Sequence, residues 1–331
     1  MTHGTGLPTY RPRRLRTTAA MRALVRETRV HPSQLVLPLF VREGATQSRP
    51  IDSLPGVSQL PLSGVADAVR AAVHAHIGGV MLFAIPEVRD ELGSAACRPN
   101  GILNLAIAEA VAAAAGQLVV MSDLCLDEFT SHGHCGVLDA NGNVDNDATV
   151  EVYAHMALAQ ARAGAQVLGL SGMMDGQVAA VRAALDAEGL TDVSLLAYAA
   201  KYASAFYGPF RDAVESQLDG DRRTYQMDPS NGREGVREAA LDELEGADIV
   251  MVKPALPYLD VLARVAEASS VPVAAYHVSG EYAQIEAAAA HGWLDRKAAH
   301  LEAVTSIVRA GADIVITYAA CDLARWLTEQ P

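Results

Sequence analysis

Short apolar runs, rich in β-branched residues, alternate along the chain with alanine-rich stretches that have helical character. A continuous apolar run of this length predicts a strand that is buried on both faces, as in a parallel sheet covered by helices. The eight predicted strands are Leu35–Val41, Gly79–Ile85, Leu118–Leu124, Gln166–Leu170, Val193–Ala199, Ala247–Val252, Val271–Val278 and Ala312–Ala319.

Helices are predicted between most of these runs, and the clearest are Val65–His76, Ile102–Ala115, Val150–Ala163 and Gln177–Glu188. Gly116, Gly164 and Gly189 follow three of them, where a helix-ending glycine is expected. Eight alternating β and α units predict a TIM (β/α)8 barrel. An open doubly wound sheet is the alternative, but no G-x-G-x-x-G motif follows the first strand.

The chain has 331 residues, more than the roughly 250 that one barrel needs. We expect an N-terminal arm over residues 1–34 and a catalytic barrel over residues 35–331. Residues 11–29 hold seven arginines and one acid, Glu27. A transit peptide and a nucleic-acid arm are possible explanations, but we favour an arm that packs on a neighbouring subunit.

The connection from Lys201 to about Glu245 is too long for one helix and contains several turn signals. It therefore predicts a loop, a helix and a lid over the barrel.

Charge and composition narrow the function. The net charge of −13 argues against nucleic acid as the main partner, and no apolar run is long enough for a membrane span. Residues 1–34 lack the apolar core of a signal peptide, so we expect a cytoplasmic protein. Its four cysteines, Cys97, Cys125, Cys135 and Cys321, are then expected to be reduced.

The lysines carry the most information, because the chain has only three of them against 23 arginines. Lys201 and Lys253 each stand just past an apolar strand, and Lys297 is the third. A lysine amine can attack a ketone and form a Schiff base, whereas a guanidinium is a poor nucleophile. Two buried lysines at neighbouring strand ends would lower each other's pKa. The alternative is that each forms a buried ion pair with Asp or Glu.

Other polar side chains stand at the carboxyl ends of the predicted strands, where barrel enzymes place their active sites. They are Asp123, Ser171, Ser279 and Tyr318. In the long fifth connection, Arg211 and Arg222 have no obvious carboxylate partner on a helix nearby. Their forked guanidinium groups would suit a substrate carboxylate.

Cys125, Asp127 and Cys135 follow the third strand in one glycine-containing loop. Two thiolates, a carboxylate and a water would make an open four-coordinate zinc site. Two cysteines are weak evidence, so ordinary thiols remain an equal alternative.

Several longer motifs resemble one family, that of porphobilinogen synthase, also called 5-aminolevulinate dehydratase. The resemblance runs from about Arg11 to Leu327. The motifs are Lys201-Tyr-Ala-Ser-Ala-Phe-Tyr-Gly-Pro-Phe-Arg211, Gly220-Asp-Arg222-Arg-Thr-Tyr-Gln226-Met, Met251-Val-Lys253-Pro, Tyr276-His-Val-Ser279-Gly-Glu-Tyr and Ser171-Gly-Met-Met-Asp175-Gly.

The resemblance implies a lyase that condenses two 5-aminolevulinate molecules to porphobilinogen with loss of two waters, early in tetrapyrrole (heme) synthesis. It implies a barrel with an arm that assembles into a homo-octamer. Lys253 would hold the first substrate, with Ser279 and Tyr318 on its carboxylate. Lys201 would hold the second, clamped by Arg211, Arg222 and Gln226, while Asp123 and Ser171 would assist proton transfer.

The metal loop departs from the family pattern. Zinc-type members have three cysteines there and another type has aspartates, whereas this chain has Cys125, Asp127 and Cys135. Zinc is our expectation for this mixed site. Some bacterial members also bind an allosteric magnesium, and Glu238 matches that position.

Two other functions would explain part of the pattern. A class I aldolase-like Schiff-base lyase needs only one of the lysines. A non-enzymatic barrel has no physical need for Lys201, Lys253, Arg211 and Arg222 together.

Overall fold

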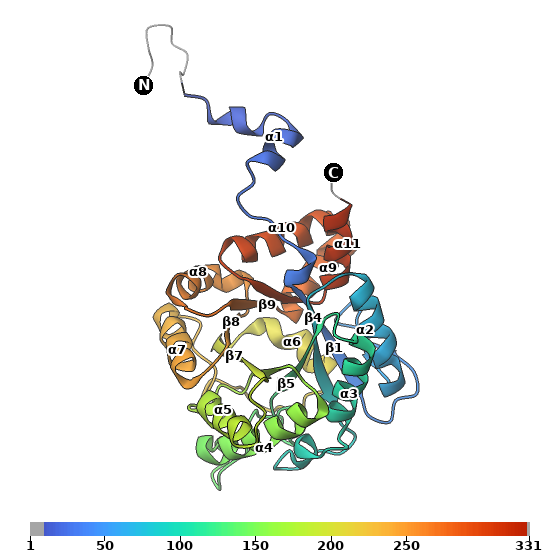
Figure 1. The fold of residues 1–331 in the computed structure, drawn as a ribbon, viewed down its shortest axis with the longest axis vertical. Helices are drawn as coiled ribbons and strands as arrows, with labels where there is room; N and C mark the ends of the chain where they lie inside the picture. Colours follow the sequence, from blue (N-terminus) through green and yellow to red (C-terminus); the bar gives the residue numbers. More distant parts are fainter. Residues whose placement is uncertain (1–9, 330–331) are drawn as a thin grey trace.

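A computed structural model describes residues 10–329. Its centre is a closed barrel of eight parallel strands, surrounded by helices (Figure 1). The barrel strands are β1 (Leu35–Arg42), β4 (Gly79–Ile85), β5 (Val119–Leu124), β6 (Val167–Leu170), β7 (Ser194–Lys201), β8 (Ile249–Lys253), β9 (Val273–His277) and β10 (Ile314–Thr317). Each coincides with one predicted run, so the TIM barrel prediction is confirmed.

Pairing of the first and last strands closes the barrel. Neighbours follow chain order from β1 and β4 to β10, and β10 pairs in parallel with β1. Two short strands, β2 (Arg49–Pro50) and β3 (Ser58–Leu60), were not predicted from the sequence. These extend the sheet beside β1, with β3 parallel to β1 and β2 antiparallel to β3.

Helices connect the strands and cover the outside of the barrel (Figure 1). They are α2 (Val65–His74), α3 (Ile102–Ala114), α4 (Asn146–Ala163), α5 (Gln177–Ala187), α7 (Gly232–Glu245), α8 (Leu259–Ala268), α9 (Ser279–Ala290), α10 (Arg296–Arg309) and α11 (Ala320–Thr328). The helix α4 begins four residues earlier than predicted, because Asp145 caps it by accepting a hydrogen bond from the Ala148 amide. No helix in residues 10–329 is long and apolar enough to cross a membrane.

The fifth connection contains a short helix, α6 (Gly208–Ala213), before α7. In the view of Figure 1, α6 projects over the centre of the barrel. Further along, α7 packs so tightly on the end of β7 that a Cβ at Gly235 would lie 2.7 Å from the hydroxyl oxygen of Tyr202, the residue after β7. This close approach explains a glycine inside a helix.

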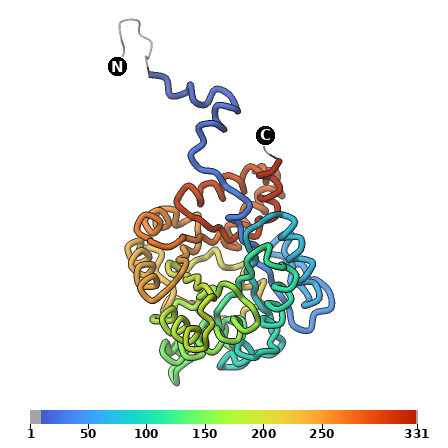
Figure 2. Tube along the Cα trace, in the orientation of Figure 1, coloured from blue at the N-terminus to red at the C-terminus, as the bar shows by residue number. Residues whose placement is uncertain are grey.

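The segment before β1 leaves the barrel as an extended arm, drawn in blue in Figures 1 and 2. It contains two 3₁₀ turns (Pro12–Arg16 and Pro32–Gln34) and the short helix α1 (Ala19–Leu24), and neither the first turn nor α1 has a buried residue. The first nine residues of the predicted arm lie outside the described residues. From residue 10 to residue 29 no side chain is buried, so this part of the arm has no core of its own within one chain.

A bulge in β7 decides which way the two strand-end lysines point. Ala197 pairs with Val250, but Ala200 pairs with Val252, so β7 has one extra residue between these pairs. Lys201 therefore pairs with Lys253. Residues paired across parallel strands face the same side, and without the extra residue Lys201 would be opposite Pro254. The bulge thus turns both amines to the barrel interior.

Candidate active site

Lys201 and Lys253 end neighbouring strands and are almost fully buried, with 5% and 6% of their surfaces exposed. The Lys201 Nζ donates a hydrogen bond to the Ser171 carbonyl oxygen at 2.5 Å. Among the described residues, neither Nζ lies within 4.0 Å of a carboxylate oxygen, since no ion pair includes it. The alternative of two buried ion pairs is therefore wrong.

Aromatic rings surround the Lys253 amine. Its Nζ lies 4.5 Å from the ring centre of Tyr276, 5.0 Å from that of Tyr198, 5.3 Å from that of Tyr207 and 5.4 Å from that of Phe210. These rings remove water from the amine without offering a carboxylate. Burial, followed by the positive charge of Lys201, lowers the pKa of Lys253 to about 7. A pKa near 7 leaves part of the amine unprotonated at neutral pH, and the unprotonated form is the one that can act as a nucleophile.

Asp123 and Ser171 lie beside the lysines and contact each other. The Ser171 hydroxyl donates to the Asp123 Oδ2 at 3.0 Å. Burial, and then the negative charge of Asp127, raise the pKa of Asp123 to about 6. A carboxyl group with a pKa near neutrality can both accept and give a proton. Its second oxygen, Oδ1, is buried and has no hydrogen-bond partner among the described residues.

The predicted metal ligands come together in one buried group. The ligand atoms of Cys125, Asp127 and Cys135 all lie within 4.8 Å of one another, and both thiols are free. Two zinc–sulfur bonds of about 2.3 Å each span at most roughly 4.6 Å, so small side-chain shifts would bring the group around one ion. No other group of this kind occurs in residues 10–329. The loop can therefore hold a metal.

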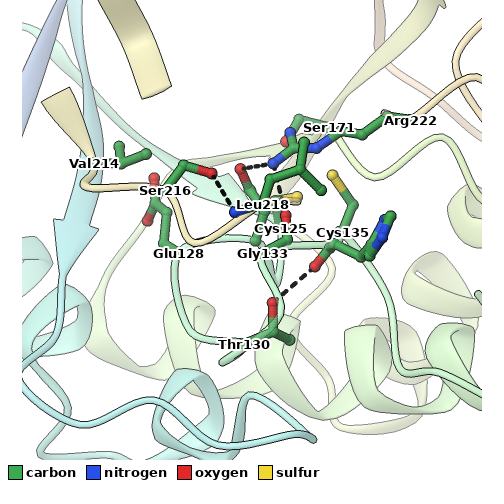
Figure 3. A network of polar contacts seen from close by, with 12 residues as sticks. Cys125, Glu128, Thr130, Gly133, Cys135, Ser171, Val214, Ser216, Leu218 and Arg222 are labelled. Carbon is green, nitrogen blue, oxygen red and sulfur yellow. Dashed lines mark hydrogen bonds and ion pairs between the residues drawn. The ribbon is translucent and has the colours of Figure 1, made fainter. Parts of the chain in front are cut away.

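The metal loop also has contacts that the sequence did not reveal. The Tyr153 hydroxyl donates to the Cys135 carbonyl oxygen and lies 3.7 Å from the Cys125 sulfur. Arg222 reaches the loop from the fifth connection, and its Nη2 lies 2.8 Å from the Asp127 Oδ2 and 2.8 Å from the Gly133 oxygen (Figure 3). Burial raises the pKa of Asp127, but Arg222 and Lys201 outweigh it, so the net pKa is lowered and the carboxylate is charged.

One small cavity joins most of the predicted site. Its volume is about 20 Å³, room for roughly one water molecule. The residues that line it are Phe83, Asp123, Asp127, Ser171, Lys201, Tyr207, Phe210, Arg211, Arg222, Gln226 and Lys253. Since Phe210 and Arg211 belong to α6, the predicted lid is closed in this structure and must move before a substrate reaches the amines.

Several buried polar atoms around this cavity have no hydrogen-bond partner in the described part of the chain. They are the Asp123 Oδ1, the Tyr198 hydroxyl, the Arg222 Nε and the Gln226 Nε2. Buried polar groups are normally paired, because an unmet donor or acceptor costs about 1–3 kcal/mol. Such a cluster of donors and acceptors beside two amines is typical of a site that a polar substrate fills.

Ser279 and Tyr318 lie on the Lys253 side of the barrel but do not line the cavity. The Ser279 Oγ accepts a hydrogen bond from the Phe210 amide at 3.0 Å and donates to the Phe206 oxygen at 3.2 Å. The Tyr318 hydroxyl lies 3.3 Å from the Tyr276 hydroxyl. In this closed state, Ser279 therefore binds the lid, and Tyr318 contacts Tyr276, one of the rings around Lys253.

Glu238 lies apart from the two lysines, on α7. It pairs with the neighbouring Arg237 at 3.1 Å. It also lines a second cavity of about 740 Å³ together with Asp175, Asp242 and Glu245. Burial, and then the nearby carboxylates of Glu245, Glu238 and Asp175, raise the pKa of Asp242 to about 7. The surroundings of Glu238 are thus acidic, and magnesium binding there stays a prediction.

Glu215 fastens the lid to the barrel. Its Oε1 lies 2.5 Å from the Arg42 Nη1, at the end of β1, and 3.1 Å from the Arg49 Nη1. Gln59 donates to the Ala213 carbonyl oxygen at 2.9 Å, at the end of α6. Arg42, Arg49 and Gln59 are far from Glu215 in the sequence, so these contacts could not be predicted.

We expect Glu215→Gln to raise KM by about threefold to fivefold with little change in kcat. Removing the charge weakens partly exposed ion pairs, a loss of ~1 kcal/mol or less, so the closed lid binds substrate less tightly. Steady-state kinetics measures both constants. Glu188→Gln, which removes an exposed ion pair with Arg162, is the control. An unchanged KM in Glu215→Gln would show that this contact does not hold the lid.

Comparisons with known proteins show what this chain is similar to. A family model described as delta-aminolevulinic acid dehydratase matches residues 9–326. A delta-aminolevulinic acid dehydratase of Mycobacterium tuberculosis is 60% identical over 323 residues, which cover 97% of this chain and 98% of that protein. That of Streptomyces coelicolor is 59% identical over 329 residues, covering 99% of this chain and 100% of that protein.

A solved structure gives the same result. The delta-aminolevulinic acid dehydratase (porphobilinogen synthase) of Toxoplasma gondii, in complex with the reaction product porphobilinogen, superposes with a TM-score of 0.93. It is 48% identical, and the match covers 96% of this chain and 92% of that chain. The similarity therefore spans both the barrel and its catalytic end.

Proposed function

This chain belongs to the delta-aminolevulinic acid dehydratase family, and from that membership and the site geometry we propose how its residues carry out the reaction. The enzyme is a lyase that condenses two molecules of 5-aminolevulinate to porphobilinogen with loss of two waters. The observation that carries the assignment of residues is the pairing of Lys201 with Lys253, two buried amines without carboxylate partners in the described residues.

Lys253 holds the first substrate. Its pKa of about 7 leaves much of the amine unprotonated at neutral pH, ready to attack the substrate ketone and form a Schiff base with loss of water. The aromatic rings around it keep bulk water away. Ser279 and Tyr318 bind the carboxylate of this substrate, which requires Ser279 to exchange its present bonds to the lid.

Lys201 holds the second substrate. Arg211 and Arg222 bind its carboxylate, and the unpaired amide of Gln226 adds a donor to the same clamp. Asp123 moves protons between the two substrates, since its Oδ1 makes no hydrogen bond in residues 10–329 and its pKa is about 6. Ser171 orients that carboxyl group through its hydrogen bond.

Cys125, Asp127 and Cys135 would hold a zinc ion, as thiolate and carboxylate ligands favour. When bound, zinc supplies Lewis-acid polarisation of an oxygen at the second substrate. Glu238 would bind a magnesium ion, since it lines an acidic cavity together with Asp175, Asp242 and Glu245.

The enzyme is proposed to be a cytoplasmic homo-octamer. Free thiols at the metal loop persist in a reducing compartment. Exposed apolar side chains on the arm support contact with a neighbouring subunit, since Tyr10 is 83% and Leu24 is 75% exposed.

Removing residues 1–34 is expected to convert the octamer into smaller species, because the arm buries its apolar side chains only against another subunit. Sedimentation velocity measures the change in mass. A variant with Leu244→Ser, which alters an exposed apolar residue on α7, controls for general surface effects. If the shortened chain keeps the mass of the full chain, the arm is not the assembly element.

The activity is tested by incubating the purified protein with 5-aminolevulinate alone. A pyrrole that reacts with Ehrlich's reagent is expected, and its yield should fall after chelation and recover with zinc. No pyrrole in the presence of either zinc or magnesium would contradict the proposed function.

The rate should also depend on pH in a defined direction. Only the unprotonated Lys253 amine attacks the ketone, so kcat/KM should rise with pH and reach half its plateau near the Lys253 pKa of about 7. Below that pH it should fall by about tenfold per unit, as one proton binds. Initial rates in constant-ionic-strength buffers test this, and a flat profile through neutrality would contradict it.

A further inference from the structure

One nitrogen of Arg222 donates two hydrogen bonds. The two hydrogen bonds that it donates, to the Asp127 Oδ2 and to the Gly133 oxygen, both come from Nη2 (Figure 3). Its Nε is buried and has no partner among the described residues. Only 9% of the residue is exposed, so water cannot serve these donors freely. Arg222 therefore holds the metal loop with one nitrogen and leaves other donors unused.

This commitment limits how Arg222 can bind a substrate. A guanidinium offers two bidentate forks, one from Nη1 and Nη2 and one from Nε and Nη2. Both forks need a hydrogen of Nη2. As long as Nη2 serves Asp127 and Gly133, a carboxylate can take only single hydrogen bonds from Arg222. A bidentate grip on a substrate requires one of the two present bonds to break.

Asp127 is the partner that can leave. The Gly133 oxygen accepts no other hydrogen bond within residues 10–329, so losing Arg222 would leave a buried carbonyl without a donor. Asp127 instead lies in the group with Cys125 and Cys135, where a cation would replace Arg222 as its partner. An exchange at Asp127 keeps every buried group paired, provided that a metal is present.

We propose that Asp127 is shared between Arg222 and the metal, and that a substrate carboxylate taking Arg222 releases Asp127 to the metal. The inference rests on the proposed function, because it needs the substrate carboxylate at Arg222. The Arg222–Asp127 ion pair breaks, and two new pairs form: Arg222 with the substrate carboxylate, and Asp127 with the metal. Arg222 thus keeps a carboxylate partner, and Asp127 keeps a cationic partner.

Metal and substrate then help each other to bind. A metal that draws Asp127 away frees Arg222 for the substrate, and a substrate that occupies Arg222 frees Asp127 for the metal. Such coupling is reciprocal by thermodynamic necessity, and typical values are about 5–150-fold in affinity. A cysteine in place of Asp127 could not form this carboxylate–guanidinium pair, so the coupling belongs to the mixed loop of this chain.

The test measures zinc affinity directly, by competition with a chromophoric chelator, with and without 4-oxopentanoate. This acid has the ketone and carboxylate of the substrate but lacks the amine needed to form a pyrrole. For the unaltered enzyme, we expect saturating 4-oxopentanoate to tighten zinc binding by about tenfold. Calorimetry should show the converse, a similar tightening of 4-oxopentanoate binding by zinc.

Two variants separate the exchange from a general effect of ligand binding. Asp127→Cys keeps a third metal ligand, so it should bind zinc tightly but lose the dependence on 4-oxopentanoate. Asp139→Asn alters a partly exposed aspartate in the turn before α4 and should keep the full tenfold coupling.

The outcomes are distinguishable from failure of the proposed function. If the enzyme forms pyrrole but 4-oxopentanoate leaves its zinc affinity unchanged, the exchange is wrong and the function stands. Equal coupling in Asp127→Cys and the unaltered enzyme would overturn it too, as would absence of zinc binding. A protein that forms no pyrrole under any metal condition would instead contradict the function itself.

Discussion

Lys253→Ala is expected to lower the rate of pyrrole formation by at least about 10⁴-fold. The buried amine that forms the first Schiff base is lost, and the other two lysines cannot replace it, because Lys201 holds the second substrate and Lys297 is on the surface. Pyrrole formation from 5-aminolevulinate measures the loss. Circular dichroism confirms that the variant is folded.

Two further variants give this prediction its controls. Lys253→Arg keeps a positive charge but cannot form a Schiff base, so it should be as inactive as the alanine variant. Lys297→Ala removes the third lysine, which pairs with Glu329 at 2.9 Å far from the cavity, and should retain full activity. Substantial turnover by either Lys253 variant would contradict the role of this amine.

Lys201→Ala is expected to lower pyrrole formation by about 10³-fold or more, while leaving the first Schiff base intact. The second substrate loses its amine partner, whereas Lys253 keeps its aromatic surroundings. Removing the positive charge of Lys201 should also raise the pKa of Lys253, because that charge is the second cause of its lowered value. Imine formation at Lys253 should therefore need a higher pH.

Borohydride trapping with 4-oxopentanoate measures that imine as a function of pH, independently of turnover. A half-maximal pH above that of the unaltered enzyme is the expected result in Lys201→Ala. If this variant keeps full activity, the two-lysine mechanism is wrong. The protein would then behave like a class I aldolase, with a single Schiff-base lysine.

The barrel and the two lysines could be predicted because their signals are local in the sequence. Each strand is a short apolar run, and the scarcity of lysine marks Lys201 and Lys253 without any knowledge of the fold. Strand order in a barrel then brings consecutive strand ends together. The same reasoning placed Cys125, Asp127 and Cys135 in one loop, and the structure brings their ligand atoms within 4.8 Å.

Features that depend on register or long-range packing could not be predicted. The bulge in β7 is one example, since nothing in the run from Ser194 to Lys201 shows that the strand has one residue too many. The group of aromatic rings around the Lys253 amine is another, because Tyr198, Phe210 and Tyr276 come from three separate segments. Alternation along β7 and β9 could have placed the two tyrosines near the interior, but not at the amine.

The pairing of Arg222 with Asp127 is the clearest case of a contact hidden from sequence. The two residues are 95 positions apart, and the sequence predicts separate roles for them, one at a substrate carboxylate and one at a metal. Only the structure shows that they form an ion pair with each other. This contact also joins the fifth connection, which carries Arg222, to the metal loop.

The measurement that tests the central claim most directly is peptide mass spectrometry of the enzyme after borohydride reduction in the presence of 5-aminolevulinate. The account predicts substrate-derived mass on the peptides that contain Lys253 and Lys201, and none on the peptide that contains Lys297. Mass on neither of the two buried lysines would contradict the account, and mass on only one of them would contradict the two-lysine mechanism.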